Sequence, residues 1–282
     1  MKNRINPDQL SLFERHRLES PQLSDDEIVR EISEHLLDET AVTPPVNVEL
    51  MASMRGIVRI EQHVQAYAGM LAPGPSGMVA HVRAGDCQER QRFTVLHETG
   101  HTLLPGFTES RHFRCAGPRV WEERMCDTTA GELLLPRRYF VADLRRTGLT
   151  MAGVGSLAKT YEASVEATAV RSVDLSPSDA LLLAFNVRHK PSEAGMETDL
   201  PPKLRLDWSY GKGQWPFLRR HKSVDEGSAF ARAHEGELVE ETGELGSLTA
   251  DDVGPVRISA RRYGAQGRVV ALVSRLVLGG DI

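Results

Sequence analysis

The sequence contains no apolar run of about 18 residues, the length that a membrane-spanning helix requires. Its N-terminus carries Lys2 and Arg4 but no apolar segment after them, so it does not have the pattern of a secretory signal peptide. Its three cysteines, Cys87, Cys115 and Cys126, have spacings that fit neither a disulfide framework nor a zinc knuckle. We therefore expect a protein of the reducing cytoplasm.

An excess of basic charge is also missing. The formal net charge over 282 residues is −5, whereas a protein that coats nucleic acid needs a basic face. Hydrophobic residues make up 40% of the chain and charged residues 26%, a balance that excludes a wholly disordered protein. The length allows one large domain or two modest ones, and the sequence has no internal repeats.

The hydrophobic pattern predicts a mixed α+β chain. Residues 1–24 are polar, and residues 25–38 predict a helix because apolar residues recur every four positions. Residues 46–84 predict a small helix and three strands in a meander. Six further segments predict helices: 89–104, 121–135, 138–147, 155–161, 164–173 and 178–186.

The character of the chain changes after these helices. Residues 191–203 hold three prolines and no periodicity, which is typical of a linker. Strand patterns follow at 204–208, 255–261 and 269–278. Residues 234–252 hold seven acidic residues and neither Lys nor Arg, which favours a solvated loop and leaves open a docking surface for a basic partner.

One predicted helix carries paired metal-ligand side chains. His97 and His101 stand one turn apart, so both imidazoles can reach a single ion. Glu98 follows the first histidine, and from there its carboxylate can reach water at the metal without binding the metal. This is the His-Glu-x-x-His arrangement. The plain alternative is two core histidines on an amphipathic helix.

A second helix can complete the site. A catalytic zinc takes three protein ligands and leaves a fourth position open. Glu123 and Asp127 lie one turn apart, so Glu123 can bind the metal while Asp127 accepts the free ring N–H of a ligand histidine. This Glu-x-x-x-Asp spacing is similar to that of the zinc peptidases called gluzincins. We therefore predict that His97, His101 and Glu123 are the metal ligands.

Three separated blocks resemble the ImmA/IrrE metallopeptidases and occur in that family's order, within a similarity that covers about residues 45–190. The blocks are Glu89–His101, Glu123–Asp127 and Leu133–Pro136. The chain departs from the family's usual small residue at Leu96, from its Asn at Asp127 and from its Met at Leu135. None of these departures removes a ligand.

The resemblance implies a zincin-like metallopeptidase domain, in which a small β-sheet accompanies the His-Glu-x-x-His helix and the glutamate helix. It implies zinc on His97, His101 and Glu123, with Glu98 as the catalytic base and Asp127 in support; manganese suits the same ligands. Members of the family cleave a helix-turn-helix repressor and so derepress stress, DNA-repair or mobile-element genes. The resemblance thus implies a cytoplasmic zinc endopeptidase with a protein substrate, which would add to an edge strand near residues 76–82.

The family's layout also implies an order of parts. They are an N-terminal helical segment (1–40), the metallopeptidase domain (41–150), a helical, helix-turn-helix-like segment packing on it (151–190), a linker (191–203) and a C-terminal α/β sensor-like domain (204–282). A GAF-like fold for the last part rests on length and order alone. Because every predicted ligand precedes Pro191, a fragment of residues 1–195 is expected to fold and bind zinc.

The alternative is a non-proteolytic regulator that binds a repressor or DNA and has a structural or sensory metal site. A structural zinc would be closed by four protein ligands, whereas the sequence indicates three. Direct DNA binding is disfavoured because Ser178–Asn186, the would-be recognition helix, is apolar and contains an acid.

Three further residues favour structural interpretations. We expect Cys126 to be buried in the core rather than to bind a metal as a thiolate. We expect His112 to lie in a solvated loop rather than to stabilise an oxyanion. We expect Tyr67 to pack within a strand rather than to line a substrate groove.

Overall fold

The computed structural model describes residues 10–41, 43–106, 112–113, 120–193, 201–264 and 267–276. The chain forms two compact units, which are described separately. The first comprises Met1–Phe140 and Ala158–Ser164, and the second comprises Val141–Leu157 and Val165–Ile282. None of the described helices combines the length and the apolar character that crossing a membrane would take.

The first unit begins with three helices: α1 (Leu12–Glu19), α2 (Asp25–Thr40) and α3 (Val48–Met54). Ser11 and Ser24 begin α1 and α2 with capping boxes, in which each serine accepts a backbone N–H and a glutamate three residues on accepts one in return. The prediction of α2 is confirmed. The polar composition of residues 1–24 concealed α1, which its cap and the burial of Phe13 stabilise.

A small sheet follows α3. Its strands are β1 (Ile57–His63), β2 (Gly69–Gly74), β3 (Gly77–Arg83) and β4 (His112–Phe113), in the order β1-β3-β2-β4. The three predicted strands are confirmed, but the meander is wrong because β1 pairs with β3 in parallel. The short turn between β2 and β3 determines that these two strands pair with each other. It does not determine that β1 pairs with β3 rather than with β2. β3 is therefore internal, and the expectation of an edge strand near residues 76–82 is wrong.

Two helices predicted from the sequence, α4 (Gln88–His101) and α5 (Val120–Leu134), pack against each other in the first unit. Gly100 permits their close approach, since a Cβ at this position would lie 2.9 Å from the Cα of Cys126. Arg92 anchors α4 by donating to the carbonyl oxygen of Val46 at 2.8 Å and by pairing with Glu162 at 3.2 Å.

The second unit is built on an antiparallel sheet of five strands in the order β6-β5-β9-β8-β7. These are β5 (Ala180–Arg188), β6 (Lys203–Lys212), β7 (Val239–Gly243), β8 (Val256–Tyr263) and β9 (Arg268–Arg275). The predicted strands at 204–208, 255–261 and 269–278 correspond to β6, β8 and β9.

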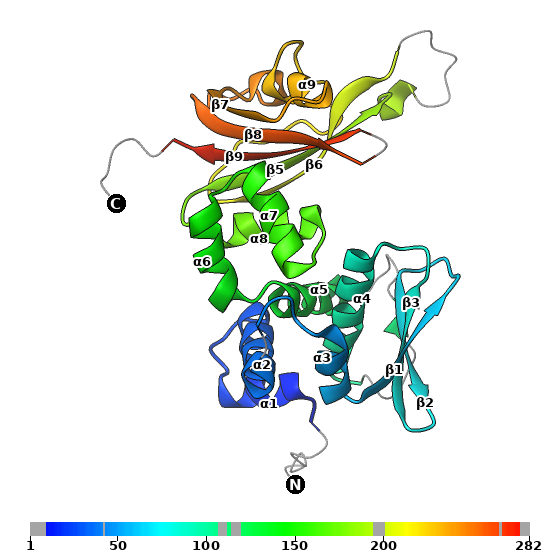
Figure 1. The fold of residues 1–282 in the computed structure, drawn as a ribbon. Coiled ribbons are helices and arrows are strands. Elements are labelled where there is room, and N and C mark those ends of the chain that lie inside the picture. The colour runs from blue at the N-terminus through cyan, green and yellow to red at the C-terminus, as the bar shows by residue number, and fades with distance from the viewer. Residues whose placement is uncertain are drawn as a thin grey trace. The chain divides into compact units, whose positions relative to one another are not determined.

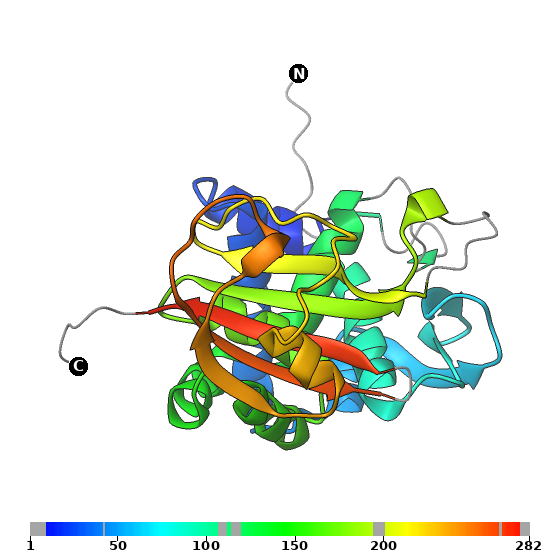
Figure 2. The ribbon, with the colours of Figure 1, turned by 90° about the horizontal axis from the view of Figure 1, so that it is seen from above.

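Helices cover both faces of this sheet. Residues of α7 (Met151–Tyr161) and α8 (Val165–Leu175) share an apolar cluster with one face, and α9 (Ala229–His234) shares another with the opposite face. Figure 1 shows the sheet between them, and Figure 2 shows α9 lying over its strands. The predicted helices that correspond to α6 (Arg137–Thr147), α7 and α8 are confirmed.

The predicted helix over 178–186 is wrong, because these residues form most of β5. Leu181 and Leu183 belong to the cluster on the α9 side, while Ala180 and Leu182 belong to the cluster with α7 and α8. A strand buried on both faces is a continuous apolar run, without the alternation that distinguishes a half-buried strand from a buried helix.

The domain boundaries drawn from the sequence fail at the same place. β5 is an internal strand of the sheet whose other strands lie in the predicted C-terminal domain, residues 204–282. That domain therefore also includes residues that the sequence assigned to the helical segment 151–190. The predicted linker, residues 191–203, lies largely outside the described residues, but the strands before and after it, β5 and β6, pair with each other, so it does not separate two domains. The GAF-like assignment stays a prediction.

The acidic run at 234–252 is not simply a loop. It contains β7, which pairs with β8 at the edge of the sheet. Arg232 forms ion pairs with Glu237, at 3.3 Å, and with Glu241. Charged side chains on an edge strand oppose its pairing with a second chain. The docking surface for a basic partner stays a prediction.

Candidate metal centre

The first unit brings the three predicted metal ligands together. His97 and His101 lie on successive turns of α4, are at most 2% exposed, and have ring centroids 5.2 Å apart. Glu123 approaches from α5, with its Oε2 3.3 Å from His97 Nε2 and its Oε1 3.9 Å from His101 Nε2. Two imidazole nitrogens and one carboxylate therefore converge from two helices.

This donor set fits a zinc ion. Imidazole nitrogen and carboxylate oxygen are ordinary zinc ligands, and bonds of about 2.0–2.1 Å at tetrahedral angles put ligand atoms about 3.3 Å apart. The separations of 3.3 and 3.9 Å between the carboxylate and the imidazoles are close to that value.

Asp127 lies behind the first histidine. Its Oδ1 is 2.8 Å from His97 Nδ1. When Nδ1 carries the ring proton it donates to this carboxylate, which leaves Nε2 as a lone-pair donor directed toward Glu123. Asp127 thus makes the contact that the sequence predicted, one helical turn after Glu123.

Glu98 is fully buried beside β2. A Cβ on Gly69 would lie 2.3 Å from Glu98 Oε1 and 2.4 Å from Thr94 Cγ2, so only glycine leaves room for the carboxylate in this position. Sequence reasoning did not identify Gly69. The available signal was a glycine within a strand, which marks a close approach of other groups to the backbone.

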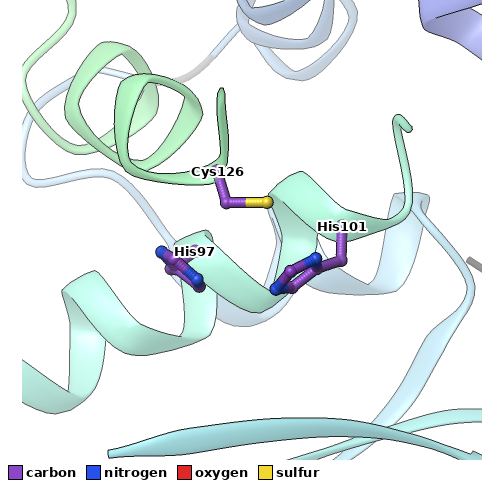
Figure 3. Close-up of side chains that lie close together, drawn as sticks. All are labelled: His97, His101 and Cys126. Atoms are coloured by element: carbon purple, nitrogen blue, oxygen red, sulfur yellow. The ribbon is translucent and has the colours of Figure 1, made fainter. Parts of the chain in front are cut away.

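Cys126 is fully buried, as predicted, but it also lies beside the two histidines. Its sulfur and one ring nitrogen of each of His97 and His101 lie within 4.8 Å of one another. Figure 3 shows both imidazoles on one side of α4 and the cysteine above them on α5. Burial raises the pKa of the thiol well above its usual value, and the negative charges of Glu98 and Glu123 add to the effect.

The other residues weighed from the sequence lie near β2. The backbone of His112 belongs to β4 and pairs with Leu71, so the loop predicted there is wrong; its side chain lies outside the described residues, as does Cys115. Tyr67 precedes β2, and its hydroxyl lies 3.9 Å from Met70 Sδ.

The chain is similar to known proteins over its central part. Residues 56–172 match the family described as the IrrE N-terminal-like domain. Over 134 residues the chain is 30% identical to the radiation response metalloprotease IrrE of Deinococcus radiodurans, a segment that covers 45% of this chain and 41% of that protein. The chain thus spans less than half the length of this curated relative.

The fold has a counterpart among solved structures. A Mycobacterium tuberculosis transcriptional regulator superposes with a TM-score of 0.58 over 94% of this chain and 79% of its own, at 12% identity. That identity supports a shared fold and no more. Residues 56–172, which contain the converging side chains of α4 and α5, are therefore the part of the chain that is similar to the IrrE N-terminal-like domain.

Proposed function

We propose that this chain is a cytoplasmic zinc-dependent endopeptidase that cleaves a helix-turn-helix transcriptional repressor at one site. The observation that supports this proposal most is the convergence of His97, His101 and Glu123 at separations that one zinc ion spans. Glu98 adds a buried carboxylate next to the first of these ligands.

Each residue of the centre has a separate task. His97, His101 and Glu123 would hold the ion, and Asp127 would keep Nδ1 of His97 protonated so that Nε2 binds. Zinc, when bound, polarises a carbonyl group and makes water nucleophilic near neutral pH. Glu98 takes the proton from the attacking water and passes it to the leaving amine, a contribution of about 10²–10⁴ to the rate.

We place the substrate on the β2–β4 side of the small sheet. β2 contacts Glu98 through Gly69, whereas β3 has strands on both sides. An extended peptide pairing at the β4 edge would gain main-chain hydrogen bonds, which position a segment without selecting its side chains. The repressor as substrate is inferred from the family resemblance, as is derepression of stress, DNA-repair or mobile-element genes.

Cys126 favours a second candidate function. With His97, His101 and Glu123 it could complete a closed set of four protein ligands, which is typical of a structural zinc. The chain would then be a non-proteolytic regulator that binds a repressor or DNA and uses its metal for stability or sensing.

Two substitutions distinguish these functions. The full chain is incubated with a candidate helix-turn-helix repressor, and zinc content and cleavage products are measured by mass spectrometry. Glu98→Gln should keep about one zinc per chain and lose cleavage, because the ligands remain and the base is gone. Cys126→Ala should keep both zinc and cleavage.

The opposite results would exclude the peptidase. Wild-type cleavage by Glu98→Gln refutes the assigned base. Loss of zinc from Cys126→Ala, together with an inert wild-type chain, supports the closed site. His101→Ala and Glu123→Ala serve as references, since each should lose most of the metal.

A further inference from the structure

A second group of metal-ligand side chains lies on the small sheet and shares no residue with the centre on α4 and α5. Glu61 and His63 are two residues apart on β1, so their side chains leave the strand on the same side. His81 is the residue of β3 that pairs with Glu61. The three side chains therefore meet on one face of two neighbouring strands.

The three side chains converge on one oxygen atom. Glu61 Oε2 lies 3.2 Å from His63 Nε2 and 3.6 Å from His81 Nδ1. The two imidazole centroids are 5.0 Å apart, and the ligand atoms of all three residues lie within 4.8 Å of one another. These separations lie near the value of about 3.3 Å expected around a tetrahedral zinc.

The second oxygen of Glu61 is held separately. Arg59 lies 3.2 Å from Oε1, which leaves Oε2 directed at the two imidazoles. A simple histidine–glutamate pair needs one imidazole, whereas this oxygen faces a second one on the adjacent strand.

We propose that Glu61, His63 and His81 form a second site, for a divalent transition-metal ion of the zinc class. Two imidazoles select zinc, nickel, copper or cobalt over magnesium and calcium, which prefer oxygen ligands. The side chains are 32%, 48% and 19% exposed, respectively, so the ion enters from solvent and keeps water at its open positions.

The ion would add a side-chain link to the backbone hydrogen bonds between β1 and β3. Since β1 is an edge strand with one partner in the described sheet, this link would reinforce its single pairing. Metal that binds only the folded state stabilises it by RT ln(1 + c/Kd), where c is the free metal concentration, so the unfolding temperature rises with metal concentration. The site does not depend on the proposed peptidase activity.

Zinc titration of the full chain tests the proposal. The protein is stripped with a chelator and titrated with Zn²⁺ in competition with a chromophoric chelator. Wild type should show a tighter event, from the α4–α5 centre, and a weaker one. His63→Asn and His81→Asn should each weaken the second event at least about tenfold and leave the first unchanged.

His189→Asn is the matched control. His189 is also part-exposed and lies 3.9 Å from one carboxylate, that of Glu193, so both events should persist. A weaker event retained in both His63→Asn and His81→Asn refutes the proposal, and so does its absence from wild type or its loss in His189→Asn. If circular dichroism shows that His81→Asn is unfolded, His63→Asn and Glu61→Gln decide the outcome, because His63 is largely exposed and its replacement should not disturb the fold. Absence of the tighter event alone would instead count against the peptidase centre.

Discussion

Replacing Asp127 by alanine should weaken zinc binding without removing a ligand. Its Oδ1 lies 2.8 Å from His97 Nδ1 and is the group that fixes which ring nitrogen faces the metal. Loss of such a partner typically lowers metal affinity 10- to 100-fold, about 1.4–2.7 kcal/mol. The Asp127 side chain is 53% exposed, so water can replace part of the hydrogen bond. We therefore expect a loss in the lower part of that range, about 10- to 30-fold.

Asparagine at the same position separates geometry from charge. Asp127→Asn keeps an oxygen that accepts the N–H of His97, so its zinc affinity should stay within a few-fold of wild type. Competition with a chromophoric chelator at fixed pH measures all variants. Thr128→Ala is the control on the same helix, since this hydroxyl bonds to the Arg124 carbonyl at 2.9 Å, away from the histidines.

An Asp127→Ala protein that binds zinc as tightly as wild type would refute the reasoning. If Asp127→Asn is as weak as Asp127→Ala, the negative charge of the carboxylate matters more than the orientation of the ring. That result would give the aspartate a role that the family's usual asparagine could not fill.

Three other changes test the packing. Gly69→Ala should displace Glu98 and lower the cleavage rate about 10²-fold or more, while zinc stays bound. Paired assays of cleavage rate and zinc content measure both effects, and a wild-type cleavage rate would contradict the prediction. Gly100→Ala should lower the free energy of unfolding by about 1–3 kcal/mol in urea titrations, because its Cβ meets the backbone of Cys126; unchanged stability contradicts this. Contrary to the expectation from the sequence, a fragment of residues 1–195 should be insoluble rather than folded, because it keeps β5 without β6 and β9; a soluble, zinc-binding fragment would contradict this.

The geometry of the candidate centre was largely accessible from the sequence. The helical period alone puts His97 over His101 and Glu123 near Asp127, because both pairs are local. Their meeting required two helices to approach, and the resemblance supplied that. Gly69 was not accessible, because its role depends on which strand lies beside α4, and no spacing rule links the two segments.

Elements with a clear period were also predicted correctly, whereas the errors have separate physical causes. α2 buries one side and exposes the other, so its pattern is visible. α4 was predicted although residues 94–101 are all buried. β5 buries both faces, and β7 lies in an acidic run whose charges resemble those of a loop. The parallel pairing of β1 with β3 is a tertiary choice that the local pattern of either strand leaves undetermined.

The position of β5 in the second sheet also determines where the chain can be cut into fragments that fold. The segment similar to IrrE ends at residue 172, within α8. Ala169 and Val173 of that helix pack in one cluster with Ala180 and Leu182 of β5. A fragment cut at the end of the similarity would therefore expose the inner face of α8 to water. Sequence similarity and structural units consequently divide the protein at different residues, and a fragment that keeps α8 should also keep the second sheet.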